Sequence, residues 1–360
     1  MTITKRQFLR SAAAAGGALM FGGRGATAQT SDPVRVVDAH THWYPREWVE
    51  LVKAEGPAHG ARIGSNERGA VTFAVPGLTA EFRPNYVDLA SRIAAMDADG
   101  IAVQVLSLMA PMVYWAPAAF ALKLSQVFND AAAAAHRAYP GRFVALAMVP
   151  MHEPTLALEE LERAAKLAGL RGVMMATAIN GKNLDEKQFF PIYAKLEELG
   201  WPMFTHPIGA LGGDRMARYY LRNLLGNPIE IGVAGYSLIL GGVFDTFPKL
   251  EVMLPRAGGN VPWGIGRLDR TVERMPELAK ANRPATQYLR RFYYDSIIES
   301  PEIVTSLIQL VGADRVLFGT DYASPMRDKN PTAFIRNLAQ VSPADRDLIL
   351  GGNAARLFRL

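Results

Sequence analysis

The chain has 360 residues, of which 49% are hydrophobic and none is cysteine, and its formal net charge is +5. A chain of this length buries one large core or two modest ones, and the lack of cysteine excludes disulfides, thiolate zinc sites and cysteine-held iron–sulfur clusters. Because the positive charge is concentrated near the N-terminus, the near-neutral remainder gives no electrostatic reason to expect a nucleic acid or an anionic membrane as partner.

The first 28 residues resemble a twin-arginine export signal, with lysine in place of the first arginine. They contain four basic and no acidic residues, so removing them lowers the charge from +5 to +1. The segment Lys5–Arg10 precedes a mildly apolar stretch from Ser11 to Gly23, and Ala26-Thr27-Ala28 has the form of a cleavage site. An ordinary secretory signal and a flexible tail are the alternatives. The apolar stretch is too short to span a membrane, and we expect a periplasmic or secreted protein.

From residue 34 onward, short apolar runs alternate with amphipathic stretches. The expected strands are Val34–His40, Ile101–Leu108, Phe143–Pro150, Gly172–Ala176, Pro202–His206, Glu251–Pro255, Phe292–Ser296 and Val316–Gly319. The expected helices are Pro117–Ala138, Thr155–Leu167, Glu186–Leu199, Pro228–Leu240, Pro262–Arg274, Pro301–Val311 and Pro331–Phe358. Eight such units predict an α/β fold, a (β/α)₈ TIM barrel over residues 34–360, with a doubly wound open sheet as the alternative. Residues 45–95, rich in Gly, Pro and Arg, are expected to form an irregular insertion over the barrel mouth.

The first expected strand ends in the sequence Asp38-Ala39-His40-Thr41-His42. Residues two apart on a strand point to the same side, so His40 and His42 project together, as two ligands of one metal ion must. Paired imidazoles are awkward in an apolar core and useful around a divalent ion. The alternative is a hydrogen-bonded polar pair. Asp38 is expected to support a ligand from behind or to cap the strand end.

Three later strand ends also carry polar residues, where a TIM barrel places its active site. His206 ends the fifth expected strand, Arg256 follows the sixth and Asp321 follows the eighth. Three imidazoles and one carboxylate suit Zn²⁺, with Mn²⁺ or Fe²⁺ as alternatives, and leave one position on the ion open. His206 as a turn residue and Asp321 as a helix cap are the simpler explanations.

Aromatic and methionine side chains follow the first two strand ends: Trp43, Tyr44, Met109, Tyr114 and Trp115. They are candidates to line a pocket for a planar organic substrate, with core or lid packing as the alternative. Asn180 and Asn260 are candidate polar contacts in the same pocket. The remaining histidines are expected on the surface or in loops: His59, His136 and His152.

Together these patterns resemble the amidohydrolase superfamily, and more closely its branch of aminocarboxymuconate-semialdehyde, resorcylate and carboxyvanillate decarboxylases. The resemblance covers nearly all of residues 34–360. It is carried by Asp38-x-His40-x-His42, Arg92-Ile93-x-x-Met96-Asp97-x-x-Gly100, His206-Pro207, Phe247-Pro248-Lys249-Leu250, Gly258-Gly259-x-x-Pro262 and Phe318-Gly319-Thr320-Asp321.

The resemblance implies one metal ion bound by four ligands: His40, His42, His206 and Asp321. It also implies non-oxidative decarboxylation of a small aromatic or muconate-like carboxylate, with Asp321 carrying a proton, and a homodimer. The expected strand Gly172–Ala176 lacks a lysine, which argues against the superfamily members with two metal ions. Metal-dependent hydrolysis of a lactone, ester or amide, with Asp321 taking a proton from water, is the alternative chemistry.

Arg256 departs from the family pattern, because at this position, before the glycine pair, the family usually carries a histidine. Arginine cannot replace that histidine as a base, since its pKa stays above about 12 in proteins. One hypothesis is that Arg256 is catalytic and clamps the substrate carboxylate against the metal. The competing hypothesis is that it pairs with Asp321 or Asp38, which leaves a degenerate site that only binds a metal or an organic acid.

Overall fold

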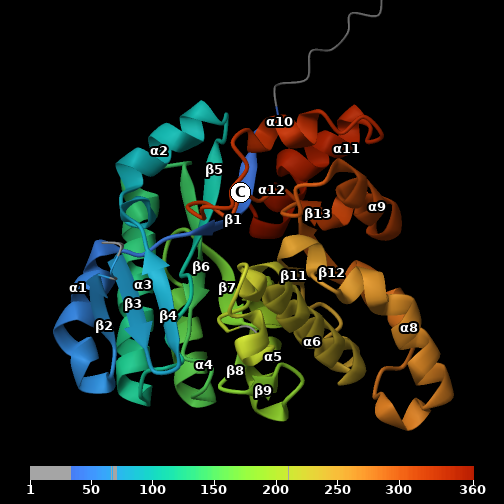
Figure 1. The fold of residues 1–360 in the computed structure, drawn as a ribbon, viewed down its shortest axis with the longest axis horizontal. Helices are drawn as coiled ribbons and strands as arrows, with labels where there is room; N and C mark the ends of the chain where they lie inside the picture. The colour runs from blue at the N-terminus through green and yellow to red at the C-terminus, as the bar shows by residue number, and fades with distance from the viewer. Residues whose placement is uncertain (1–33, 66, 68–70, 210) are drawn as a thin grey trace, which may run out of the picture. The chain divides into compact units, whose positions relative to one another are not determined.

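The computed structural model describes residues 34–65, 67, 71–209 and 211–360. Its main sheet has eight parallel strands that follow one another in chain order (Figure 1). They are β1 (Val37–His42), β5 (Val103–Ser107), β6 (Phe143–Met148), β7 (Leu170–Ala176), β10 (Met203–His206), β11 (Val252–Leu254), β12 (Phe292–Asp295) and β13 (Val316–Leu317). Each strand overlaps one of the eight expected strands. Every strand residue except Arg171 is buried, as in a parallel sheet covered on both faces.

The two ends of this sheet are joined by backbone hydrogen bonds. The Ala39 amide donates to the Phe318 carbonyl at 2.9 Å, and the Asp321 amide donates to the His40 carbonyl at 2.9 Å. The segment after β13 therefore runs alongside β1 and leaves no free edge between them. The fold is the predicted (β/α)₈ barrel, and the open doubly wound alternative, which keeps two free edges, is wrong.

Helices follow the strands and cover the outside of the barrel. They include α3 (Ala118–Ala138), α4 (Pro154–Ala164), α5 (Phe190–Leu199), α6 (Asn227–Leu240), the short α7 (Val243–Thr246), α8 (Val261–Arg274) and α9 (Pro301–Val311). Several carry proline in the first turn, where the missing N–H needs no partner. Within the described ranges, none of the helices combines the length and apolar character needed to cross a bilayer.

The single long helix expected over Pro331–Phe358 is wrong. A short helix, α10 (Pro331–Arg336), comes first. A second helical stretch then runs from α11 (Pro343–Asp347) through a π-helical segment (Leu348–Gly352) into α12 (Asn353–Phe358). Pro343 lacks an N–H and disfavours helical backbone at Ser342, which instead caps α11 by accepting the Asp345 amide at 3.1 Å. The proline and its capping serine thus start a new helix.

The insertion between β1 and β5 is more regular than its composition predicts. It consists of α1 (Arg46–Glu55), an antiparallel sheet of β2 (Arg62–Ser65), β3 (Val71–Val75) and β4 (Leu78–Phe82), and α2 (Leu89–Ala98). Pro76 and Gly77 join β3 to β4, and Gly77 has φ +79°, which suits glycine at the end of a two-residue turn. Figure 1 shows the small sheet beside α1. The Tyr44 amide, just after β1, donates to the Tyr86 carbonyl and fastens the insertion there.

The insertion has its own packed centre around Trp48. This side chain is 0% exposed, and its ring lies 5.6 Å from that of Tyr44 and 5.5 Å from that of Phe73. We expect Trp48→Ala to lower the free energy of unfolding by about 3–5 kcal/mol, the usual effect of deleting a buried aromatic ring. Urea denaturation measures the change. Trp263→Ala is the matched control: Trp263 is 47% exposed, and its replacement is expected to stay within about 0.5 kcal/mol. Equal losses in both variants would contradict the packing argument.

Candidate metal centre

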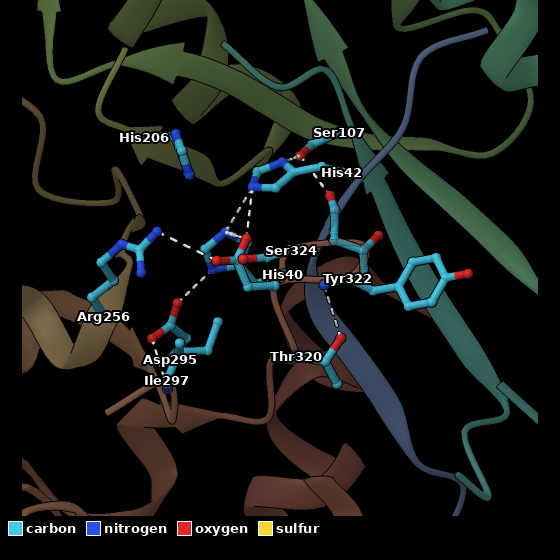
Figure 2. Close-up of polar contacts among 12 residues, drawn as sticks. His40, His42, Ser107, His206, Arg256, Asp295, Ile297, Thr320, Tyr322 and Ser324 are labelled. Atoms are coloured by element: carbon cyan, nitrogen blue, oxygen red, sulfur yellow. Dashed lines mark hydrogen bonds and ion pairs between the residues drawn. The ribbon is translucent and has the colours of Figure 1, made fainter. Parts of the chain in front are cut away.

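Three histidines converge at the carboxyl ends of two strands, as Figure 2 shows. His40 and His42 come from β1 and His206 from β10, and their side chains are 0%, 1% and 5% exposed. The Nε2 atoms of His40 and His42 lie 3.2 Å apart. One ring nitrogen from each of the three residues lies within 4.8 Å of the other two. We call these three residues the histidine triplet. The structure thus brings together three of the four metal ligands expected from the sequence.

The hydrogen bonds of two of these rings assign their protons. His40 Nδ1 lies 2.6 Å from Asp295 Oδ2, and His206 Nδ1 lies 2.8 Å from the Pro207 carbonyl oxygen. A carboxylate and a carbonyl only accept, so both Nδ1 atoms carry the proton and both Nε2 atoms present a lone pair. In the described part of the chain, His206 Nε2 is buried with no hydrogen-bond partner. A bound cation would satisfy it.

His42 is oriented by Ser107 in the same way. Ser107 Oγ donates to the Thr41 carbonyl at 2.8 Å, which leaves its lone pairs to accept from His42 Nδ1 at 3.3 Å. Burial lowers the pKa of His42 to about 4 and the pKa of His206 well below its usual value. Both rings are therefore neutral near pH 7, as metal ligands must be.

Asp321 adds a carboxylate oxygen next to the imidazole nitrogens of the histidine triplet. Its Oδ1 lies 3.1 Å from His42 Nε2 and 3.8 Å from His40 Nε2. Burial by itself would raise the pKa of Asp321, but the close approach of His42 and the charge of Arg256 hold that pKa well below its usual value. A proton on His42 Nε2 would satisfy one of the surrounding acceptors, whereas a divalent cation would satisfy all of them. The residues present therefore fit a metal ion.

Asp38 is buried on β1, two residues before His40. Its Oδ2 accepts from Thr320 Oγ1 at 2.6 Å and from Gln104 Nε2 at 3.0 Å, while its Oδ1 accepts from the Thr320 amide at 3.0 Å and the His40 amide at 3.3 Å. Burial raises its pKa to about 6, against the opposing effect of these hydrogen bonds. This geometry suits the supporting role that the sequence predicts.

Asp295 is a site residue that the sequence analysis missed. It ends β12 and accepts from His40 Nδ1, from the Ala257 amide at 3.1 Å and from the Ile297 amide at 3.1 Å. It thereby fixes the orientation of the His40 ring. The available signal was an acidic residue at the carboxyl end of an expected strand, the same signal that points to Asp321.

Arg256 lies two residues after β11, with its backbone in the left-handed region at φ +52°. Its Nη2 is 3.3 Å from Asp321 Oδ2, and its Nε is buried without a hydrogen-bond partner in the described part of the chain. It therefore contacts Asp321, one of the two acids named in the competing hypothesis. Asp38 is occupied by other donors, as described above. A guanidinium with an unpaired N–H beside the triplet is also what the clamp hypothesis requires.

The aromatic pocket candidates are mostly packed into the core. Trp43 and Tyr44 are buried and bond backbone carbonyls, Trp43 Nε1 at 3.0 Å and Tyr44 Oη at 2.5 Å. Tyr114 is buried, and Trp115 is half-buried with its Nε1 donating to a backbone carbonyl at 3.1 Å. Asn260 is exposed just before α8. For Trp43, Tyr44 and Tyr114 the structure favours core packing over a pocket.

The other candidates also lie outside the triplet. Met109 is half-buried, and Asn180 is exposed and donates to a backbone carbonyl. The three remaining histidines are half-buried, and none joins the triplet in the described part of the chain: His59, His136 and His152. Two of them, His136 and His152, bond backbone carbonyls. Among the described residues, none of the three therefore supplies the base that arginine cannot supply at position 256.

Comparison with known proteins supports a metal centre. The model of the amidohydrolase family matches residues 37–360. A 2-amino-3-carboxymuconate-6-semialdehyde decarboxylase of Dictyostelium discoideum is 33% identical over 328 residues, which cover 90% of this chain and 91% of that protein. The structure of 5-carboxyvanillate decarboxylase from Sphingomonas paucimobilis is 26% identical, with a TM-score of 0.79 and coverage of 91% of this chain and 100% of that one.

A dihydroxybenzoic acid decarboxylase from a Polaromonas species was solved with bound manganese and the inhibitor 2-nitroresorcinol. It is 26% identical, with a TM-score of 0.74, and the match covers 90% of this chain and 97% of that one. Together with the histidine triplet, this supports a divalent metal in the present chain. The chain belongs to the amidohydrolase family, and the similar proteins described above are decarboxylases of that family.

Proposed function

We propose that this protein is a metal-dependent carboxy-lyase that removes CO₂, without oxidation, from a small aromatic or muconate-like carboxylate. The observation that carries the proposal is the buried histidine triplet facing Asp321 at the carboxyl ends of the barrel strands. The similar decarboxylases act on 2-amino-3-carboxymuconate-6-semialdehyde and 5-carboxyvanillate, which are planar, unsaturated carboxylates. We expect a substrate of this class.

The ligands of the proposed single metal ion are the histidine triplet and Asp321. Three imidazoles and one carboxylate favour Zn²⁺, and the manganese in the Polaromonas enzyme makes Mn²⁺ the alternative. When bound, the ion supplies positive charge that attracts the substrate carboxylate and stabilises negative charge during the reaction. Elemental analysis of natively purified protein distinguishes the two ions.

The chain's own residues supply substrate orientation and proton transfer. In decarboxylation a π electron pair of the substrate binds a proton at the carbon that bears the carboxylate. The bond from that carbon to the carboxylate then breaks, and its electron pair restores the π bond as CO₂ leaves. Asp321, held as a carboxylate beside Arg256, must gain a proton before it can donate one. We propose that Asp321 takes a proton from a hydroxyl or amino group of the substrate and passes it to that carbon, and solvent restores the proton to the substrate group. Arg256 holds the carboxylate in place for this transfer.

Product analysis tests the proposal. The protein, loaded with Zn²⁺ or Mn²⁺, is incubated with 2-amino-3-carboxymuconate-6-semialdehyde, 5-carboxyvanillate and a dihydroxybenzoate, together with a panel of lactones and esters. We expect one carboxylate to release CO₂ with no net addition of water. A product heavier by one water would instead establish a hydrolase. Saturable binding of a carboxylate with no turnover of any compound would identify a binding protein.

Residues 1–28 lie outside the described residues, and we propose that they direct export to the periplasm by the twin-arginine route. The full chain is expressed in a bacterium that has this route, and the periplasmic and cytoplasmic fractions are compared. We expect the wild type in the periplasm and Arg6→Lys in the cytoplasm, because the route reads the basic pair. If the wild type and Arg6→Lys are both exported, the segment is an ordinary secretory signal. If neither is exported, the segment is a tail.

We also propose that the protein is a homodimer, as the family resemblance implies. The mass of the native protein in solution tests this. Twice the mass of the chain, which is 39.3 kDa before any processing, supports a dimer, and a single chain mass contradicts it.

A further inference from the structure

Arg92 belongs to a motif that the sequence analysis singled out without giving it a role. It lies on α2, outside the barrel, yet its side chain is 0% exposed. Burial lowers its pKa to about 10, so it is still a cation near pH 7. A buried guanidinium is usually paired with a carboxylate, because an unpaired buried charge is costly. Among the described residues, no carboxylate oxygen lies within 4.0 Å of Arg92.

The Arg92 guanidinium instead contacts three groups close to the metal centre. Its Nη2 donates to the carbonyl of His42, a member of the triplet. Its Nη1 donates to Gln104 Oε1 at 3.1 Å. Its central carbon lies 4.6 Å from the ring centroid of Tyr322, the residue after Asp321. One buried cation on α2 thus contacts two of the three chain segments that carry expected ligands, the end of β1 and the segment after β13.

Gln104 extends this contact to Asp38. Its amide oxygen accepts from Arg92 and its amide nitrogen donates to Asp38 Oδ2 at 3.0 Å, so the amide connects the buried cation to the buried anion. Asp38 in turn accepts from the backbone amides of His40 and Thr320. The amide of Asp321 donates to the His40 carbonyl. The chain of contacts therefore reaches the backbone at or next to three expected ligands.

We infer that Arg92, Gln104 and Asp38 form one buried positioning network that fixes the backbone of His42, His40 and Asp321 for metal binding. Arg92 is then a positioning residue supplied by the insertion, which lies outside the barrel. The inference rests on the metal centre proposed above. It explains why a guanidinium is buried at this point: a methionine would fill similar space, but the His42 carbonyl and the Gln104 amide oxygen would both lose the donor that Arg92 supplies.

The test compares Arg92→Met, Arg92→Lys and a matched control, Arg142→Met. Arg142 bonds Asp97 on α2 at 2.7 Å and the Ala102 carbonyl just before β5, and none of its hydrogen bonds in the described part of the chain reaches the site. Three quantities are measured: Mn²⁺ affinity by titration calorimetry, the visible absorption of the Co²⁺-substituted protein, and the thermal midpoint without metal.

We expect Arg92→Met to weaken Mn²⁺ binding about 10- to 100-fold and to shift the Co²⁺ spectrum, as changes behind metal ligands usually do. Arg142→Met is expected to leave the affinity and the spectrum unchanged. Arg92→Lys keeps the positive charge but lacks the planar pair of N–H donors, and we expect it to bind Mn²⁺ about tenfold more weakly than the wild type. This variant keeps the inference testable if Arg92→Met does not fold.

Two results would overturn the inference alone: wild-type Mn²⁺ affinity and spectrum in the Arg92 variants, or an equal loss of affinity in Arg142→Met, which would indicate general destabilisation. A wild-type chain that binds neither Mn²⁺ nor Co²⁺ would overturn the proposed metal centre and this inference with it.

Discussion

Replacing His206 with alanine is expected to reduce CO₂ release by on the order of 10³-fold or more, because the metal supplies several kcal/mol of charge stabilisation and each 1.36 kcal/mol is tenfold in rate. Removal of the metal with a chelator should have the same effect on the wild type. The barrel should remain folded, since His206 Nε2 makes no hydrogen bond within the described part of the metal-free chain. Single-turnover CO₂ release and the thermal midpoint without metal measure the two quantities.

Two controls separate loss of the metal from loss of the fold. His59→Ala removes a histidine outside the triplet, whose ring packs 4.6 Å from that of Phe120, and its turnover should stay near wild type. Added Zn²⁺ or Mn²⁺ should restore the chelated wild type but not His206→Ala. Turnover that survives both complete chelation and His206→Ala would contradict a metal-dependent reaction.

The eight barrel strands were predictable because parallel strands buried on both faces appear as short, continuous apolar runs. The number of strand–helix units also predicted the closed barrel, but not the backbone hydrogen bonds that close it, such as that from the Asp321 amide to the His40 carbonyl. Residue types carry no signal for such a contact between the two ends of a chain. The β3–β4 hairpin was missed because its Pro-Gly turn lies in a segment whose composition is typical of loops.

The site was predictable where one pattern fixed several residues. The spacing of His40 and His42 places both rings on one side of a strand, and the barrel then brings the ends of the other strands to them. Asp295 has no partner at a diagnostic spacing, so only the fold shows that it bonds His40. The sequence also does not predict which way a side chain points once the chain has passed the end of a strand. Trp43 and Tyr44 follow His42 directly, yet their polar atoms bond the backbone of the insertion and of the segment after β5.

Arg256→Met is expected to raise the KM for the carboxylate substrate by about 10- to 100-fold, since a hydrogen bond between charged groups contributes about 1.5–3 kcal/mol. Arg256→His should give a similar rise, because an imidazole has no pair of parallel N–H donors. Steady-state kinetics with direct titration of the carboxylate measure the effect. Arg270→Met is the control, because Arg270 is exposed on α8 and pairs only with Glu273 in the described structure; its KM should not change.

The competing hypothesis predicts a different pair of results. If Arg256 serves only to neutralise Asp321, its removal leaves carboxylate affinity unchanged and frees the Asp321 oxygen that lies 3.3 Å from the guanidinium. Metal affinity then rises in Arg256→Met, because a cation no longer competes for that carboxylate. Unchanged carboxylate affinity in both Arg256→Met and Arg256→His would rule out the clamp. A rise in KM with little change in metal affinity would instead make Arg256 the residue through which this chain recognises its substrate.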